Sequence, residues 1–165
     1  MGYVIVDEQM KTNQTNVYAI GDCTEFPLTL FGGHRFSLPH AHAAQFQGTL
    51  WFRNECKIAA MSITNRTNSI EYVPFIWTDL FDRHITFCGD FFTTSMANVE
   101  TIVKGNIFEN TYCCYILKND EVIAVIDCSK KAVAVQFIEI FRLKIKVKQE
   151  MIESNPNDNW KWLQE

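Results

Sequence analysis

Glycine is scarce in this chain of 165 residues, and the glycines present do not form a phosphate-binding turn. A dinucleotide-binding turn needs the pattern G-x-G-x-x-G, because the backbone must approach the pyrophosphate with no side chain in the way. The sequence has no such pattern, and its seven glycines stand at positions 2, 21, 32, 33, 48, 89 and 105. This absence excludes a complete dinucleotide-binding site of that type within the sequence.

Metal-ligand spacing is also lacking. The six cysteines include no C-x-x-C pair and no Cys/His spacing suited to zinc or to an iron–sulfur cluster. We interpret them as reduced core thiols and predict no metal site.

Excess basic charge and long apolar runs are missing as well. Fifteen Lys and Arg stand against 19 Asp and Glu, giving a net charge of −4, so we expect no nucleic-acid partner. No stretch approaches the roughly 20 apolar residues of a membrane span, and the first ten residues do not form a signal peptide. We expect an intracellular protein, cytoplasmic or mitochondrial, without a membrane span.

What the sequence does contain indicates folded domains. Hydrophobic residues make up 47% and charged residues 21%, a balance typical of a globular protein. The pattern predicts a short strand over Gly2–Val6 and a second strand over Val17–Ile20 that ends at Gly21-Asp22. A loop follows over 25–36, and then a helix to about Asn54, with Ser37 as N-cap and Pro39 in its first turn.

The second part of the chain has a different pattern. Residues 57–71 are polar and lack periodicity, so we predict a linker there, between a first segment 1–56 and a second domain 72–165. Strands are expected in the second domain, and Lys118–Glu121 supplies the turn of a hairpin; the strand ranges are 72–77, 84–89, 99–104, 112–117 and 122–127. A helix over about 130–144 with an apolar face should cover this sheet, an α+β arrangement; the face comprises Ala134, Phe137, Ile138 and Phe141. The tail carries Trp160 and Trp162, which we expect to pack on their own domain.

The order of several segments resembles one family. It runs from Gly2-Tyr3-Val4-Ile5-Val6-Asp7 through Val17-Tyr18-Ala19-Ile20-Gly21-Asp22-Cys23 to Tyr72-Val73-Pro74-Phe75-Ile76-Trp77-Thr78. In this order the chain resembles the FAD-dependent pyridine-nucleotide oxidoreductases with two dinucleotide-binding domains, especially the Rieske-bearing members of the apoptosis-inducing-factor-like branch. Ferredoxin reductases and monodehydroascorbate reductases are similar too. The resemblance implies the closing strand and helix of a doubly wound FAD-binding domain (α/β), followed by an α+β C-terminal reductase domain.

The resemblance also implies site residues. Gly21 would lie near the FAD diphosphate, and Asp22 would hold the ribityl chain. His40, Ala41 and His42 would lie nearest the isoalloxazine, at the start of the predicted helix, where free amide groups favour negative charge. Trp77 either flanks the flavin from the second domain or is a core aromatic residue.

The missing glycine turns limit this function. Because neither dinucleotide turn is present, we expect a partial FAD site and no NAD(P)H binding by this chain alone, which would be the C-terminal piece of a larger reductase. No residue is predicted to act as general base or nucleophile, since hydride transfer to flavin depends on positioning. The electron acceptor and the oligomeric state, monomer or homodimer, stay open. The alternative is a redox-inactive short protein that uses the α+β domain as an interaction module.

Overall fold

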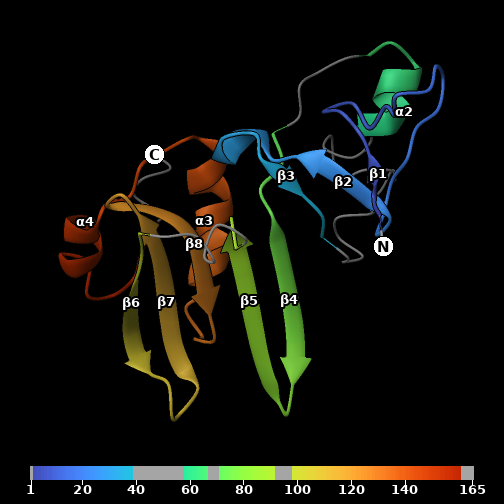
Figure 1. The fold of residues 1–165 in the computed structure, drawn as a ribbon. Helices are drawn as coiled ribbons and strands as arrows, with labels where there is room; N and C mark the ends of the chain where they lie inside the picture. Colours follow the sequence, from blue (N-terminus) through green and yellow to red (C-terminus); the bar gives the residue numbers. More distant parts are fainter. Residues whose placement is uncertain (1, 39–57, 67–70, 92–97, 161–165) are drawn as a thin grey trace. The chain divides into compact units, whose positions relative to one another are not determined.

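The computed structural model describes residues 2–38, 58–66, 71–91 and 98–160. It divides into two compact units, Met1–Tyr72 and Val73–Glu165 (Figure 1). Helix α2 (Ile58–Ile63) lies inside the stretch predicted as a linker and buries Ile58, Ala59 and Ser62. The linker and domain limits themselves stay a prediction.

The first unit contains a small three-stranded sheet in the order β1-β2-β3. Strand β1 (Val4–Ile5) pairs in parallel with β2 (Thr24–Pro27), and β2 pairs antiparallel with β3 (Arg35–Phe36). A 3₁₀ turn, η1 (Thr29–Phe31), lies between β2 and β3. The buried apolar side chains of this unit include Val6, Met10, Phe26, Leu28 and Phe36. The helix predicted up to Asn54 lies outside the described residues.

The strand expected over 17–20 is not formed, and that prediction is wrong. This stretch instead folds back on the loop before it: Tyr18 makes a single bridge with Lys11, and the Ala19 N–H donates to the Met10 carbonyl at 3.1 Å. The regular strand begins later, at Thr24, inside the region expected to be a loop. The strand begins later because the chain turns at Gly21 and lies beside β1 only after that turn.

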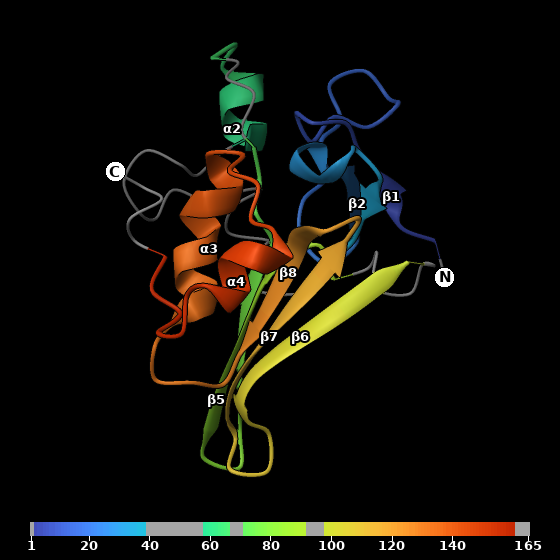
Figure 2. The same cartoon turned by 90° about the vertical axis from the view of Figure 1, so that its left-hand side faces the viewer.

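The second unit is a five-stranded antiparallel sheet in the order β4-β5-β8-β7-β6. The strands are β4 (Phe75–Leu80), β5 (Arg83–Gly89), β6 (Val99–Asn106), β7 (Thr111–Lys118) and β8 (Glu121–Asp127). Helix α3 (Val133–Arg142) lies along one face of the sheet (Figure 2), and a short helix α4 (Gln149–Glu153) follows. The predicted antiparallel hairpin is confirmed: β7 and β8 pair through Lys118 and Glu121.

Helix α3 is held to the sheet by its apolar face and by Asp127. The predicted residues Ala134, Phe137 and Phe141 are buried, whereas Ile138 is only partly buried. Val133 and Ile140 complete the face. None of the described helices is long and apolar enough to cross a membrane.

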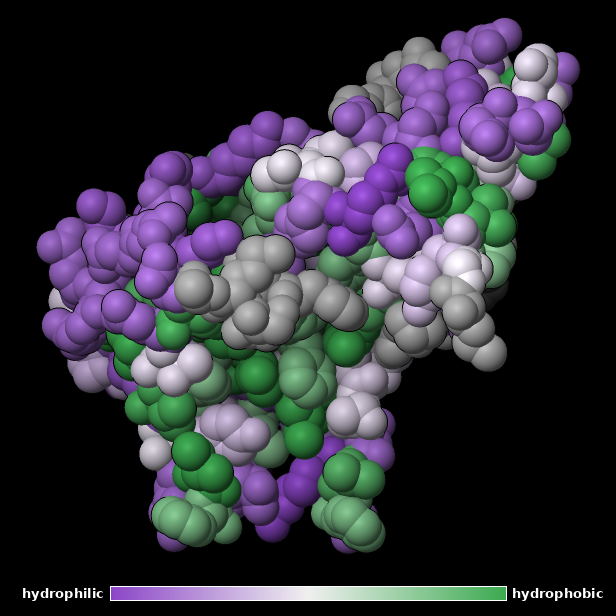
Figure 3. Space-filling view, viewed as in Figure 1, coloured by the Kyte–Doolittle hydropathy of each residue, from purple (hydrophilic) through white to green (hydrophobic). Residues whose placement is uncertain are grey.

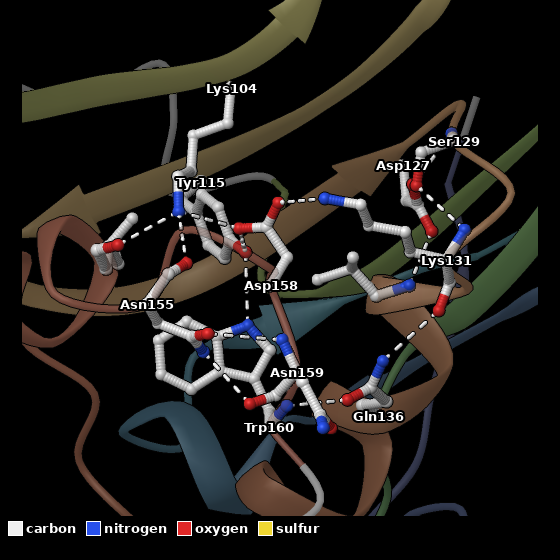
Figure 4. Close-up of polar contacts among 12 residues, drawn as sticks. Lys104, Tyr115, Asp127, Ser129, Lys131, Gln136, Asn155, Asp158, Asn159 and Trp160 are labelled. Carbon is white, nitrogen blue, oxygen red and sulfur yellow. Dashed lines mark hydrogen bonds and ion pairs between the residues drawn. The ribbon is translucent and has the colours of Figure 1, made fainter.

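Trp160 packs against the core of its own unit, as expected, whereas Trp162 lies outside the described residues. The Trp160 side chain is fully buried, and its ring centroid lies 5.4 Å from that of Phe137 and 6.0 Å from that of Tyr115. The Trp160 Nε1–H donates to the Tyr115 hydroxyl at 3.1 Å, and that hydroxyl donates to Asp158 Oδ1 at 2.8 Å (Figure 4).

Asp158 lies between two lysines. Its carboxylate is 2.9 Å from Lys104 Nζ and 3.2 Å from Lys131 Nζ, and its side chain is 5% exposed. Lys104 also donates to the carbonyls of Ile152 and Asn155, at 3.0 and 2.6 Å. The C-terminal segment is therefore attached to strand β6 through a charge cluster centred on the buried Asp158 carboxylate.

Burial on its own acts to raise the pKa of Asp158. The hydrogen bonds from Lys104, Tyr115 and Lys131 outweigh that effect, so the pKa of this carboxyl lies below its usual value. A carboxyl whose pKa is lowered by folding stabilises the fold above its unfolded pKa, about 3.9 for Asp. That contribution is lost as the pH falls through the lower, folded pKa.

We predict that Asp158→Asn lowers the free energy of unfolding at neutral pH by about 2 kcal/mol, because two lysines lose their counter-ion. The loss should shrink below about pH 4, where the wild-type carboxyl becomes protonated as well. Urea unfolding at several pH values measures both effects. Asp120→Asn is the control, since this exposed carboxylate lies 3.9 Å from Lys148 Nζ and should contribute little. An equal loss at every pH would contradict the role given to the charge.

Candidate functional site

The predicted site residues Gly21 and Asp22 lie in a tight turn that leads into β2. Gly21 has φ +86°, a left-handed conformation that favours glycine over residues with a Cβ atom. The carbonyl of Gly21 accepts two hydrogen bonds from Thr24, one from its N–H at 3.0 Å and one from its hydroxyl at 2.7 Å. Because Thr24 is buried, the turn is anchored to the body of the first unit.

Asp22 stands exposed at this turn. Among the described residues, no donor is hydrogen-bonded to its carboxylate. Its oxygens can therefore accept hydrogen bonds from a ligand hydroxyl. The flavin contacts that the resemblance implies for Gly21 and Asp22 stay a prediction.

Thr24 was missed by the sequence prediction, although it is the residue that fixes the turn. The available signal was its position three residues after Gly21, where a hydroxyl can reach back to a backbone carbonyl. Cys23 adds a weaker contact, from its thiol to the Ile20 carbonyl at 3.5 Å.

A second feature of the first unit is an open groove beside β1, with a volume of about 640 Å³. Its apolar wall is Tyr3, Val4 and Ile5, all of which are exposed. Its polar wall includes Lys11 and Arg35. Arg35 is held in place, because its guanidinium donates to the carbonyl of Val6 at 2.6 Å and to that of Glu25 at 3.2 Å. Strands in parallel sheets are normally covered on both faces, whereas both residues of β1 are exposed.

The remaining predicted site residues are three residues outside the described part of the chain and one residue of the second unit. His40, Ala41 and His42 lie outside the described residues. Trp77 belongs to β4 in the second unit, is 36% exposed, and has its ring centroid 6.2 Å from that of Phe75. The structure therefore places Gly21 and Asp22 together in one unit and Trp77 in the other.

Two thiols of the second unit are buried away from any role as nucleophiles. Cys88 and Cys113 are buried, and burial raises the pKa of both thiols. A raised pKa keeps a thiol protonated and poorly nucleophilic. Within the described ranges, no group of three or more His, Cys, Asp and Glu side chains is arranged to hold a metal ion.

Comparison with known proteins confirms the predicted resemblance. Residues 1–48 match the family model described as pyridine nucleotide-disulphide oxidoreductase. The chain is 26% identical to apoptosis-inducing factor 3 of Mus musculus over 152 residues, which is 92% of this chain and 23% of that protein. It is 30% identical to peroxisomal monodehydroascorbate reductase 1 of Oryza sativa subsp. japonica over 89 residues, covering 54% of this chain and 18% of the relative.

The fold is confirmed by solved structures. The crystal structure of the covalent putidaredoxin reductase–putidaredoxin complex contains a chain that superposes with a TM-score of 0.73 at 19% identity. The match covers 93% of this chain and 34% of that one. An FAD-dependent pyridine nucleotide-disulphide oxidoreductase from Desulfovibrio vulgaris gives a TM-score of 0.68. The α+β reductase-type fold is thus established, and the chain spans about a quarter of the length of apoptosis-inducing factor 3.

We predict that Gly21→Ala destabilises the chain by about 1 kcal/mol, because alanine is strained at φ +86°. Gly2→Ala is the matched control, since a Cβ atom added at Gly2 meets nothing within 4 Å. Urea unfolding followed by circular dichroism measures both variants. If Gly21→Ala and Gly2→Ala are equally stable, the turn does not require glycine.

Proposed function

We propose that this chain forms the C-terminal part of an FAD-dependent NAD(P)H oxidoreductase, which passes hydride from NAD(P)H to flavin and electrons onward to an acceptor. The observation that carries the proposal is the Gly21-Asp22 turn, inside the stretch that matches the oxidoreductase family model. In this proposal the chain contributes one side of the FAD site. The glycine-rich turns for FAD and NAD(P)H come from polypeptide outside this sequence.

The first unit supports the proposal because apolar residues of its sheet are exposed. The parallel pair β1–β2 is the start of a sheet type that is normally buried on both faces, yet Tyr3, Val4 and Ile5 are exposed. Further strands of an FAD-binding domain would cover them. Unit 2 supports the proposal by its fold, which has the sheet and helix of a reductase C-terminal domain.

The residues present fit the proposed flavin role. Gly21 would permit close approach of a diphosphate, and the exposed carboxylate of Asp22 would accept a hydrogen bond from a ribityl hydroxyl. FAD, when bound, supplies the hydride-accepting chemistry. His40, Ala41 and His42 would lie at the ring, and Trp77 would flank it. This chain supplies no general base, because its proposed contribution is to position the group.

The second candidate is a redox-inactive protein that uses the α+β domain for interaction. The observation in its favour is that the second unit has a core of its own, built on Tyr115, Phe137 and Trp160. Such a domain can keep its fold without flavin.

Sequencing the transcript upstream of the codon for Met1 separates the two candidates. We expect an open reading frame that contains two G-x-G-x-x-G patterns, and a purified product of that frame that shows flavin absorbance and bleaches on addition of NADH or NADPH. An in-frame stop codon directly before Met1, with no separate polypeptide that restores flavin binding, would favour the interaction module.

In the longer polypeptide, we predict that Asp22→Ala lowers the ratio of bound flavin to protein, with a loss in affinity of about tenfold for one hydrogen bond to a charged group. Flavin absorbance after gel filtration measures this ratio. Asp22→Asn should retain more flavin, because its amide oxygen still accepts a hydrogen bond. Asp82→Asn, in a hairpin turn of the second unit, is the control. Unchanged flavin occupancy in Asp22→Ala would refute the role.

A further inference from the structure

Two hairpins of the second unit end in exposed apolar side chains. The β4–β5 hairpin carries Leu80 and Phe81 at its end, and the β6–β7 hairpin carries Ile107 and Phe108. These two hairpin ends, with their four apolar residues, are together named the tip pair. Phe81 is 89% exposed and Phe108 is 97% exposed. Both hairpins reach the same end of the sheet (Figure 1), and their ends are green in the hydropathy view (Figure 3).

The backbone at Phe81 is unusual for an aromatic residue. Phe81 and Asp82 form a two-residue turn in which both have positive φ, +47° and +60°. The β7–β8 hairpin has the same backbone geometry but uses Asn119 and Asp120, which tolerate it. A phenylalanine at such a position strains the turn, and an 89% exposed side chain gains little from burial in return. Strain at an exposed residue points to a role outside the fold.

The second tip is shaped to present its aromatic ring. The Asn106 side-chain oxygen accepts hydrogen bonds from the N–H groups of Phe108 and Glu109, at 3.0 and 3.4 Å. The two hairpins are also joined, because the Arg83 guanidinium donates to the Glu109 carbonyl at 3.4 Å. The tip pair thus has two protruding apolar ends that are linked by one hydrogen bond.

The charges around the tip pair select among its partners. Asp79, Asp82 and Glu109 carry negative charge, while Arg83 carries positive charge, and Asp79 is paired with His84 at 2.8 Å. A second copy docked tip to tip would bring like carboxylates together, and an anionic lipid surface would be repelled by them. A phosphatidylcholine surface instead presents choline cations outermost, which complement the carboxylates.

Shape favours the same partner. Two separate tips at one level require two matched pockets in a protein, whereas a lipid surface accepts both without matched shape. We propose that the tip pair inserts into a zwitterionic, phosphatidylcholine-type membrane surface, with Phe81 and Phe108 among the acyl chains and Asp82 and Glu109 at the headgroups. This docking is peripheral and does not depend on the flavin proposal, since it uses only the second unit.

Sedimentation of the full chain with phosphatidylcholine vesicles tests the proposal. We expect wild-type chain to bind, and the double variant Phe81→Asn with Phe108→Ser to lose about tenfold or more in lipid partitioning, since two large apolar side chains leave the bilayer. Phe81→Asn alone should be at least as stable as wild type, because asparagine fits the left-handed turn. A purely structural role for Phe81 predicts the opposite change in stability.

Two single variants serve as controls. Ile5→Ser removes an exposed apolar side chain from the first unit, and Val135→Ser removes one from helix α3. Both should bind phosphatidylcholine vesicles like wild type. Absence of wild-type binding, equal binding by the double variant, or loss of binding in Ile5→Ser would each overturn the proposal. Binding only when a third of the lipid is phosphatidylserine, or self-association that the double variant abolishes, would overturn it as well.

Discussion

The carboxylate of Asp127 is the interaction on which the second unit depends. It ends β8, the central strand of the sheet, and accepts hydrogen bonds from the N–H groups of Ser129 at 2.8 Å and Val133 at 2.6 Å. Ala132, the residue before helix α3, offers no side-chain cap, so the buried Asp127 satisfies the helix start in its place. The direction of α3 across the sheet follows from this anchor, and the packing of Phe137 against Tyr115 and Trp160 depends on that direction.

Local patterns explain what the sequence could predict in this unit. The β7–β8 hairpin is encoded by two largely apolar runs and a turn at Asn119 and Asp120, all within 17 residues that contact one another directly. The apolar face of α3 is likewise encoded by spacing. The cap by Asp127 and the cluster of Lys104 with Asp158 join residues far apart in sequence, and nothing in their own neighbourhoods indicates the partner. Helix α2 escaped prediction because six residues are too few to show helical periodicity.

At the candidate site, the chemical role expected of Gly21 and Asp22 stays a prediction, whereas the expected local structure was wrong. Gly21 and Asp22 were expected to end a strand, whereas they precede one, because the positive φ of Gly21 turns the chain before it meets β1. The pattern of Val17 to Ile20 is apolar enough for a strand, yet Val17 and Ile20 are exposed and their stretch pairs with the preceding loop. The hydrophobic pattern of a segment indicates whether its residues suit a buried strand. It does not indicate whether another strand or helix is present to bury that segment.

The two units differ in whether another element covers their sheet. In the second unit, helix α3 covers one face of the sheet, and the buried Trp160 packs against Phe137 of that helix. The largest buried side chains of this unit therefore have their contacts within the unit. The first unit keeps a buried centre around Phe26 and Phe36 but leaves Val4 and Ile5 of β1 exposed beside the groove. An exposed apolar strand of a parallel pair costs free energy that a covering sheet recovers. The same covering would bring a ligand's remaining contacts to the turn at Asp22, so completion of the sheet and completion of the flavin site are, in this proposal, one event.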